Sequence, residues 1–154
     1  MKCLLVLWSY HHENTKRVAD VLAAELGAEI KAPDGLCPSE TQAYDLIGFG
    51  SGIYGAALDP KVIRFADQLP PAGAQRAFIF STAAIVTEKK TRKDHAAIRE
   101  VLESKGYTVV GDFSCPGFNT NSFLKLFGGM NRGRPNAGDL ERARIFARGL
   151  KGLT

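Results

Sequence analysis

The sequence predicts a doubly wound α/β domain in which a five-stranded parallel sheet, in the order 2-1-3-4-5, lies between two layers of helices. Short apolar runs rich in Val, Ile and Phe alternate with amphipathic stretches of helical length, which is typical of parallel strands joined by crossover helices. The chain has 154 residues, of which 45% are hydrophobic and 23% charged. This balance predicts one soluble globular domain spanning residues 1–154.

The first half of the chain begins this alternation. Apolar runs predict strands at residues 3–8 and 44–50, and a weaker strand is predicted at residues 28–31. Between the first two, residues 14–26 carry apolar side chains at helical spacing, and Gly27 is a favoured helix end. The next helix is expected to begin at Asp59-Pro60, because Asp caps a helix and Pro suits its first position.

The second half continues the pattern with strands at 76–80 and 107–113, a helix at 93–104 and a last helix from about Asn136. The connection over residues 114–135 is longer than the others. Connections of that length in a compact domain are usually functional or contain a small element of their own. Three apolar residues predict a short helix there, Phe123, Leu124 and Phe127.

The loop after the first predicted strand is rich in hydroxyl, amide and imidazole groups. It contains Ser9, Tyr10, His11, His12, Glu13, Asn14 and Thr15. A helix start of this kind can bind an anion, because its first four N–H groups have no partner inside the helix. The same residues also fit plain helix caps, and the two histidines fit either a phosphate ligand or an ordinary surface position. No third histidine lies close enough in sequence to indicate a metal site.

Two further segments follow predicted strands. The first runs Gly50, Ser51, Gly52, Ile53, Tyr54 and Gly55, and the second runs Ser81, Thr82, Ala83 and Ala84. Glycines on both sides of an aromatic residue let the backbone approach a flat ligand on which Tyr54 stacks. Ligands of doubly wound sheets lie at the carboxyl ends of the strands, so the three segments together predict a site for a phosphate joined to a planar ring. Ordinary loop and strand-end roles are the alternative for each.

Several of these motifs resemble the flavodoxin family, in particular its short single-domain members. They are Asn14-Thr15, residues 50–54, Ser81-Thr82, and Gly133-Arg134-Pro135-Asn136 followed by Asp139-Leu140. The resemblance covers nearly the whole chain. It implies a noncovalently bound FMN whose phosphate lies in the 9–15 loop and whose ring lies between residues 51–55 and 81–84. Many flavodoxins have Thr-Gly where this chain has His12-Glu13, so the loop here is bulkier and carries an acidic side chain.

The net charge of +4 is unevenly distributed, with −2 over residues 1–86 and +6 over residues 87–154. Electron carriers of the flavodoxin family are acidic, whereas this chain is basic. The basic half indicates an acidic redox partner, an anionic small molecule or a solvated surface. No module or interleaved aromatic and basic platform indicates nucleic-acid binding.

The cysteines and the apolar runs indicate the cellular setting. Cys3, Cys37 and Cys115 are an odd number and lie far apart, which disfavours a disulfide scaffold and a cysteine-rich metal site, and Cys115 is expected to be structural. The N-terminal apolar run is too short for a secretory signal, and no run reaches the roughly 20 residues of a membrane span. A cytoplasmic protein is therefore expected.

Three functions remain open. The first is a flavodoxin-like carrier that transfers electrons through FMN and needs no catalytic side chain. The second is an FMN-dependent NAD(P)H quinone or flavin reductase, or a flavodoxin-like oxidase. In this case the long connection, with Arg132 and Arg134, forms a substrate lid or holds an anionic nicotinamide cofactor. The third is an interaction domain of the same fold that has lost FMN, as Glu13 in the phosphate loop would allow.

Overall fold

Parallel strands form the centre of the computed structural model, which describes residues 1–10, 13–118, 129 and 131–153. The sheet contains β1 (Cys3–Trp8), β2 (Glu29–Lys31), β3 (Leu46–Tyr54), β5 (Arg76–Ala83) and β6 (Thr108–Pro116). Its order is β2-β1-β3-β5-β6, and every neighbouring pair on this path is parallel. The predicted order of five parallel strands is confirmed. A short strand that the sequence did not reveal, β4 (Ala57–Leu58), pairs antiparallel with β3.

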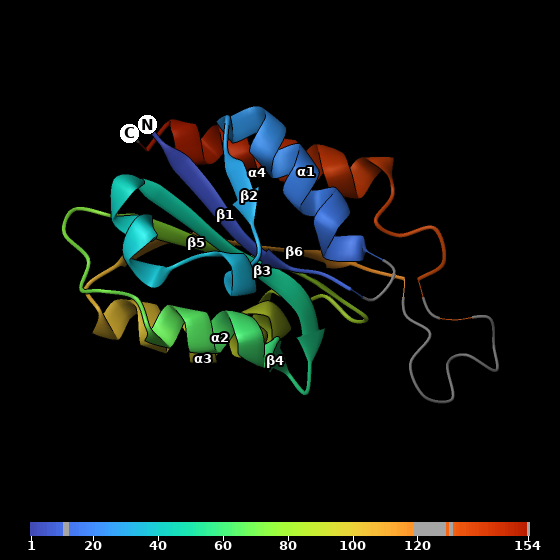
Figure 1. Ribbon diagram of the computed structural model, residues 1–154. Coiled ribbons are helices and arrows are strands. Elements are labelled where there is room, and N and C mark those ends of the chain that lie inside the picture. Colours follow the sequence, from blue (N-terminus) through green and yellow to red (C-terminus); the bar gives the residue numbers. More distant parts are fainter. Residues whose placement is uncertain (11–12, 119–128, 130, 154) are drawn as a thin grey trace.

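Helices cover both faces of the sheet, as Figure 1 shows. On one face lie α1 (Asn14–Leu26) and α4 (Ala137–Lys151), and on the other lie α2 (Pro60–Asp67) and α3 (Glu88–Ser104). Two 3-10 helices, η1 (Pro33–Gly35) and η2 (Pro38–Ala43), lie between β2 and β3. This three-layer arrangement is the flavodoxin-like fold. No helix in the described part of the chain is both long and apolar enough to cross a membrane.

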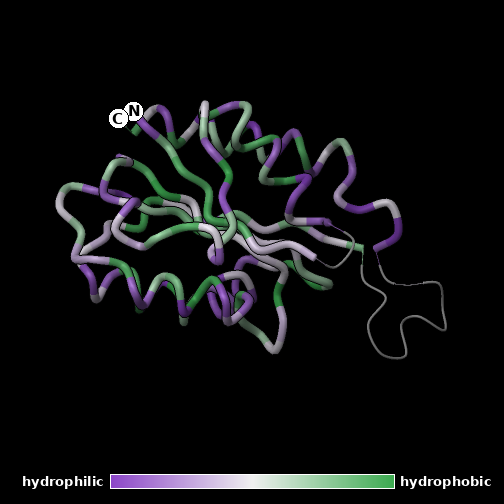
Figure 2. Tube along the Cα trace, in the orientation of Figure 1, coloured by the Kyte–Doolittle hydropathy of each residue, from purple (hydrophilic) through white to green (hydrophobic). Residues whose placement is uncertain are grey.

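The core has two halves because successive side chains of a strand point to opposite faces. Leu5 of β1 packs in the half beneath α1 and α4, whereas Leu4 packs in the half beneath α2 and α3. Figure 2 shows apolar residues along the central strands and alternating polarity along the helices. Phe80 of β5 fills the space over Gly50 of β3, where an added Cβ would lie 2.2 Å from its ring. Gly50 therefore makes room for an aromatic core residue.

Two strands extend beyond their predicted ends, which corrects the loop assignments. β3 continues to Tyr54 and β5 to Ala83, and Gly52 pairs with Thr82 in the parallel ladder. Glycine weakens a strand, so the glycine-rich sequence of residues 50–55 predicts a loop. In the folded protein, pairing with β5 keeps it extended. Only Gly55 and Ala56 form the turn into β4, and both have positive φ (58° and 60°), as in the tight turns that join hairpin strands.

Two other boundaries also differ. α3 begins at Glu88 and not near residue 93, because the Thr87 side chain accepts a hydrogen bond from the Lys90 N–H and caps the helix. The basic residues among 89–93 are unfavourable near the positive end of a helix dipole, so the sequence does not predict a helix start at Glu88. β6 continues to Pro116, so the long connection begins at Gly117. The short helix predicted from Phe123, Leu124 and Phe127 lies outside the described residues.

Candidate functional site

A shallow, open hollow lies at the carboxyl ends of β1, β3, β5 and β6. Nine residues of the segments predicted from the sequence line it: Ser9, Asn14, Thr15, Gly52, Ile53, Tyr54, Thr82, Ala83 and Ala84. The other two lining residues, Gly117 and Phe118, come from the long connection. The tertiary structure therefore gathers parts of all the predicted segments at one place.

Hydroxyl and amide groups form the end of the hollow next to α1. The Thr15 and Thr82 hydroxyls lie 2.8 Å apart and are both buried. Ser9 Oγ accepts a hydrogen bond from the Lys16 N–H at 3.2 Å, and Asn14 Nδ2 donates to the Phe118 carbonyl at 2.8 Å. These groups lie at the helix N-terminus, whose partial positive charge favours an anion.

Glu13 lies at this helix start in an unfavourable backbone conformation. It has φ 53° and ψ 27°, the left-handed region in which glycine has no steric cost, and its side chain makes no cap hydrogen bond. Glu13 is exposed and does not line the hollow. The acidic group therefore does not occupy the hollow, and the backbone keeps the shape that a glycine would allow.

Replacing Glu13 with Gly is expected to raise the free energy of unfolding by about 1 kcal/mol, because it relieves the left-handed strain of an L-residue. Urea unfolding of the ligand-free protein measures this. Glu13→Ala is the matched control: it removes the same charge but keeps the Cβ, so it should leave stability within about 0.5 kcal/mol of the parent. Equal stabilisation by both variants would mean that charge, and not backbone strain, is the cause.

Tyr54 forms the aromatic wall. Its ring lies across Gly52, where an added Cβ would come within 2.6 Å of the Tyr54 hydroxyl. The Tyr54 and Tyr10 rings stack with centroids 5.5 Å apart and an interplanar angle of 18°. Burial, together with the neighbouring Tyr10, raises the pKa of Tyr54 above its ordinary value, so the phenol is neutral at physiological pH. Gly52 thus makes room for a flat ring against the end of β3.

Other predicted residues point away from the hollow. Ser51 is fully buried, accepts from the Asp59 N–H at 2.8 Å and donates to the Gly52 carbonyl. Ser81 is also fully buried, with its Oγ 2.8 Å from His95 Nε2. Both segments are strands, in which successive side chains point to opposite faces of the sheet. Ser51 and Ser81 therefore point to the face that α2 and α3 cover. Gly55 lies in the hairpin turn, and the predicted ligands His11 and His12 lie outside the described residues.

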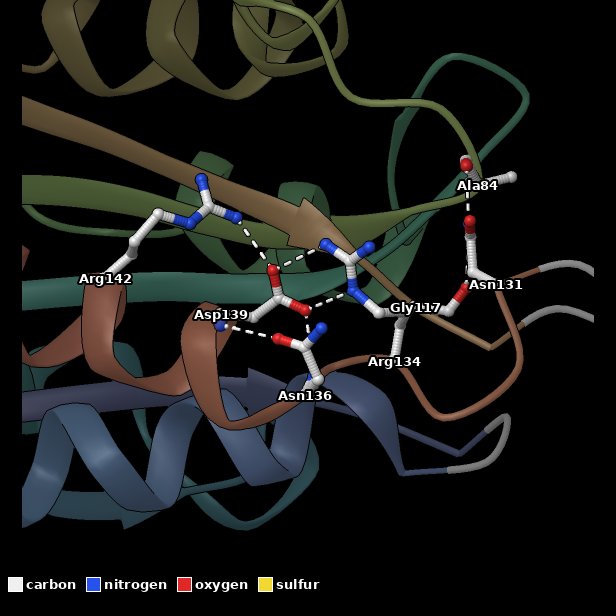
Figure 3. A network of polar contacts seen from close by, with 7 residues as sticks. All are labelled: Ala84, Gly117, Asn131, Arg134, Asn136, Asp139 and Arg142. Carbon is white, nitrogen blue, oxygen red and sulfur yellow. Dashed lines mark hydrogen bonds and ion pairs between the residues drawn. The ribbon is translucent and has the colours of Figure 1, made fainter.

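The last part of the long connection, residues 131–135, is hydrogen-bonded to residues that follow β5 and β6, as Figure 3 shows in part. Asn131 Nδ2 donates to the Ala84 carbonyl at 2.6 Å and, more weakly, to the Gly117 carbonyl at 3.4 Å. The Phe118 N–H donates to the Arg134 carbonyl at 3.0 Å. Together with the Gly117 N–H, which donates to the Ala83 carbonyl at 3.0 Å, these contacts bring Gly117 and Phe118 to the hollow.

Asp139 connects this segment to α4. Its carboxylate accepts two hydrogen bonds from Arg134, at 2.5 and 2.7 Å, one from Arg142 at 2.9 Å, and one from the Asn136 N–H at 2.8 Å. Asn136 Oδ1 accepts from the Asp139 N–H in return, which completes a capping box at the start of α4. The Arg134 guanidinium, aided by the other donors, holds the pKa of Asp139 well below its usual range. Arg134 is therefore occupied by a carboxylate of its own chain.

Cys115 is buried beside the same network and has no disulfide partner. Burial, with a smaller contribution from Asp139, raises the pKa of its thiol to about 12. A thiol with this pKa is protonated and unreactive at neutral pH. Cys115 is thus the structural cysteine that the sequence predicts.

Comparison with known proteins agrees with this architecture. No protein-family model matches the sequence. The chain is 40% identical over 150 residues to the uncharacterized protein MJ0298 of Methanocaldococcus jannaschii, an alignment that covers 97% of this chain and 98% of the archaeal protein.

Solved structures with the same fold include several flavodoxins. A flavodoxin of Streptococcus pneumoniae TIGR4 has a TM-score of 0.73 and 14% identity, with 99% of each chain covered. Flavodoxin 2 from Bacillus cereus has a TM-score of 0.72 and 18% identity over the full length of both chains. A WrbA-like flavodoxin from Agrobacterium tumefaciens has a TM-score of 0.68 and 17% identity, covering 99% of this chain and 97% of that one. The chain therefore belongs to the family of MJ0298 and is a short single-domain protein of flavodoxin-like fold.

Proposed function

We propose that this protein binds one FMN noncovalently in the hollow and acts as an electron carrier. The observation that supports this most directly is the composition of the hollow. A helix N-terminus with buried hydroxyls lies at one end and a stacked aromatic ring at the other, between the ends of β1, β3, β5 and β6. A doubly wound sheet binds its ligand in that position.

The residues present fit such a ligand. No carboxylate is among the described residues that line the hollow, so nothing there repels a phosphate. Gly117 has no side chain at a point where an added Cβ would lie 2.7 Å from Asn14 Nδ2 and 3.1 Å from the Thr82 Cβ. The end of β6 can therefore pass close to Asn14 and Thr82 while the hollow stays open.

Each group has a distinct role in this proposal. Ser9, Asn14 and Thr15 hold the phosphate together with the first N–H groups of α1, and His11 and His12 remain predicted partners. Tyr54 orients the ring, and the backbone of Gly52 and Ile53 lies at the ring edge. The flavin, when bound, supplies the redox chemistry. Tyr54 would disfavour negative charge on a ring stacked against it, because the face of a neutral aromatic side chain is itself electron-rich.

Titration of the ligand-free protein with FMN and, separately, with riboflavin tests the phosphate end, because only FMN has the phosphate. Thr15→Val keeps the shape of Thr15 and removes its hydroxyl, so FMN affinity should fall about tenfold, or 1.4 kcal/mol, while riboflavin affinity stays within about twofold. Quenching of flavin fluorescence reports both. Equal losses for the two ligands would contradict the phosphate assignment.

Tyr54→Ala is the complementary variant, since it removes a contact with the ring that the two ligands share. It should weaken FMN and riboflavin by similar factors. Failure of the parent protein to bind either flavin would favour an interaction domain that has lost FMN.

The reductase alternative has less support from the side chains. Arg134, which the sequence offered for an anionic nicotinamide cofactor, is bound to Asp139. Steady oxidation of NADPH by the FMN-loaded protein with a quinone as acceptor would nevertheless establish it, because a carrier turns over only with a separate reductase.

A further inference from the structure

Positive charge is concentrated at the end of the molecule that contains the hollow. We define the site end as the described residues from the ends of β1, β3, β5 and β6 through the sixth residue of each following helix. These are residues 9–10, 13–19, 55–65, 84–93, 117–118, 129 and 131–142. The site end has eleven Lys and Arg against five Asp and Glu, a net charge of +6, whereas the rest of the described chain has eight against eleven, a net charge of −3. The charge of the protein is therefore strongly polarised along the strand direction.

Much of this positive charge is not neutralised locally. Five basic side chains of the site end are exposed and have no carboxylate within 4.0 Å among the residues that the structure describes: Arg17, Arg64, Lys89, Lys93 and Arg132. Asp139, in contrast, is shared by two arginines. A solvated surface usually mixes both signs of charge in similar numbers, whereas this one carries a clear excess of positive charge around the hollow.

Two large apolar side chains are exposed at the same end. Tyr10 is 58% exposed and Ile85 is 55% exposed. Tyr10 stacks on Tyr54 in the wall of the hollow, and Ile85 directly follows Ala84 in its lining. Protein interfaces combine an apolar centre with a polar, charged rim, and this surface has that composition.

We propose that the site end docks a redox partner protein through an acidic surface of that partner. This inference rests on the proposed function, because a carrier must bring its cofactor close to that of its partner. The cations steer the acidic partner to the hollow, and Tyr10 and Ile85 make the apolar contact. The apolar pair beside the hollow favours a protein over a nucleic acid, whose phosphates would be contacted by a line of cations.

Electron transfer from a reduced, strongly acidic [2Fe–2S] ferredoxin to the FMN-loaded protein tests the docking, with stopped-flow absorbance as the readout. We expect the second-order rate constant to fall at least tenfold between low and about 0.5 M salt, because screening removes the steering. Lys89→Glu with Arg132→Glu should lower the low-salt rate constant about tenfold. FMN affinity should not change, since neither residue lines the hollow.

Lys105→Glu with Lys151→Glu is the matched control, because it changes the net charge by the same amount outside the site end. It should lower the rate constant less than twofold. Equal effects of the two double variants, or a rate constant independent of salt, would overturn the proposal. So would equally fast transfer from a basic haem protein.

A binding experiment separates this proposal from the proposed function. NMR titration of the FMN-free protein with oxidised ferredoxin should shift backbone signals near Ile85, Lys89 and Arg132 and should lose these shifts in high salt. If FMN does not bind, the carrier function fails while this titration still tests the surface. Tight binding of an RNA or DNA oligonucleotide there at about 0.15 M salt, without binding of ferredoxin, would overturn the choice of partner.

Discussion

Replacing Asp139 with Ala is expected to lower the free energy of unfolding by about 2 to 3 kcal/mol, measured by urea denaturation at neutral pH. The Asp139 side chain is 3% exposed and binds Arg134, Arg142 and the Asn136 N–H. Its loss leaves the Asn136 N–H and the two guanidiniums without their acceptor and removes one half of the capping box. The two guanidiniums are partly exposed and regain water, which keeps the loss below that for a fully buried ion pair.

Glu141→Ala is the control on the same helix. Glu141 is exposed and pairs only with Arg144 among the described residues, so its replacement should cost less than about 0.5 kcal/mol. If the two variants differ by less than about 1 kcal/mol, the Asp139 network does not anchor residues 131–135.

The difference in stability between the parent protein and Asp139→Ala should depend on pH. The pKa of Asp139 is lower in the folded than in the unfolded protein, so folding is stabilised while the carboxylate is ionised. The stability difference between the parent and Asp139→Ala should therefore be complete above about pH 4 and shrink as the pH falls below it. A difference that grew on acidification would contradict the contacts described for Asp139.

Replacing His95 with Ala is expected to lower the free energy of unfolding by about 3 kcal/mol. His95 is fully buried on α3, with Nε2 2.8 Å from Ser81 Oγ and Nδ1 2.7 Å from Asp112 Oδ1. Asp112 is also bound by Arg99. Alanine would leave a cavity and remove one hydrogen bond from Ser81, which keeps its bond to Ser114, and one from Asp112, which keeps Arg99. Arg92→Ala on the exposed face of the same helix should cost less than about 0.5 kcal/mol.

This variant also tests which side of β5 faces the ligand. Ser81 contacts His95, while Thr82 contacts Thr15 in the hollow. His95→Ala should therefore reduce stability without changing the ratio of FMN to riboflavin affinity. A changed ratio would mean that the two faces of the strand are coupled.

The order and most of the elements of this fold follow from the sequence itself. Residues 14–26 form a helix within the predicted bounds, because the apolar spacing and Gly27, with φ 64°, are local properties of the chain. Asp59 caps α2 as expected, for the same local reason. The carboxyl-end segments that were predicted to form the site also line the hollow.

Only the tertiary structure decided where the strands end and which side chains reach the hollow. Pairing with β5 extends β3 through Gly52 to Tyr54, and this turns Ser51 away from the ligand side. Gly117 reaches the hollow because its N–H donates to the Ala83 carbonyl at 3.0 Å, at the end of the β5–β6 ladder, and its carbonyl accepts from Asn131. Such contacts join residues distant in sequence and leave no periodic pattern or motif. They exist only once the chain has folded. The sequence by itself therefore determined the architecture and most of the residues that line the hollow, but not the long-range contacts that turn Ser51 away from it and bring Gly117 and Phe118 to it.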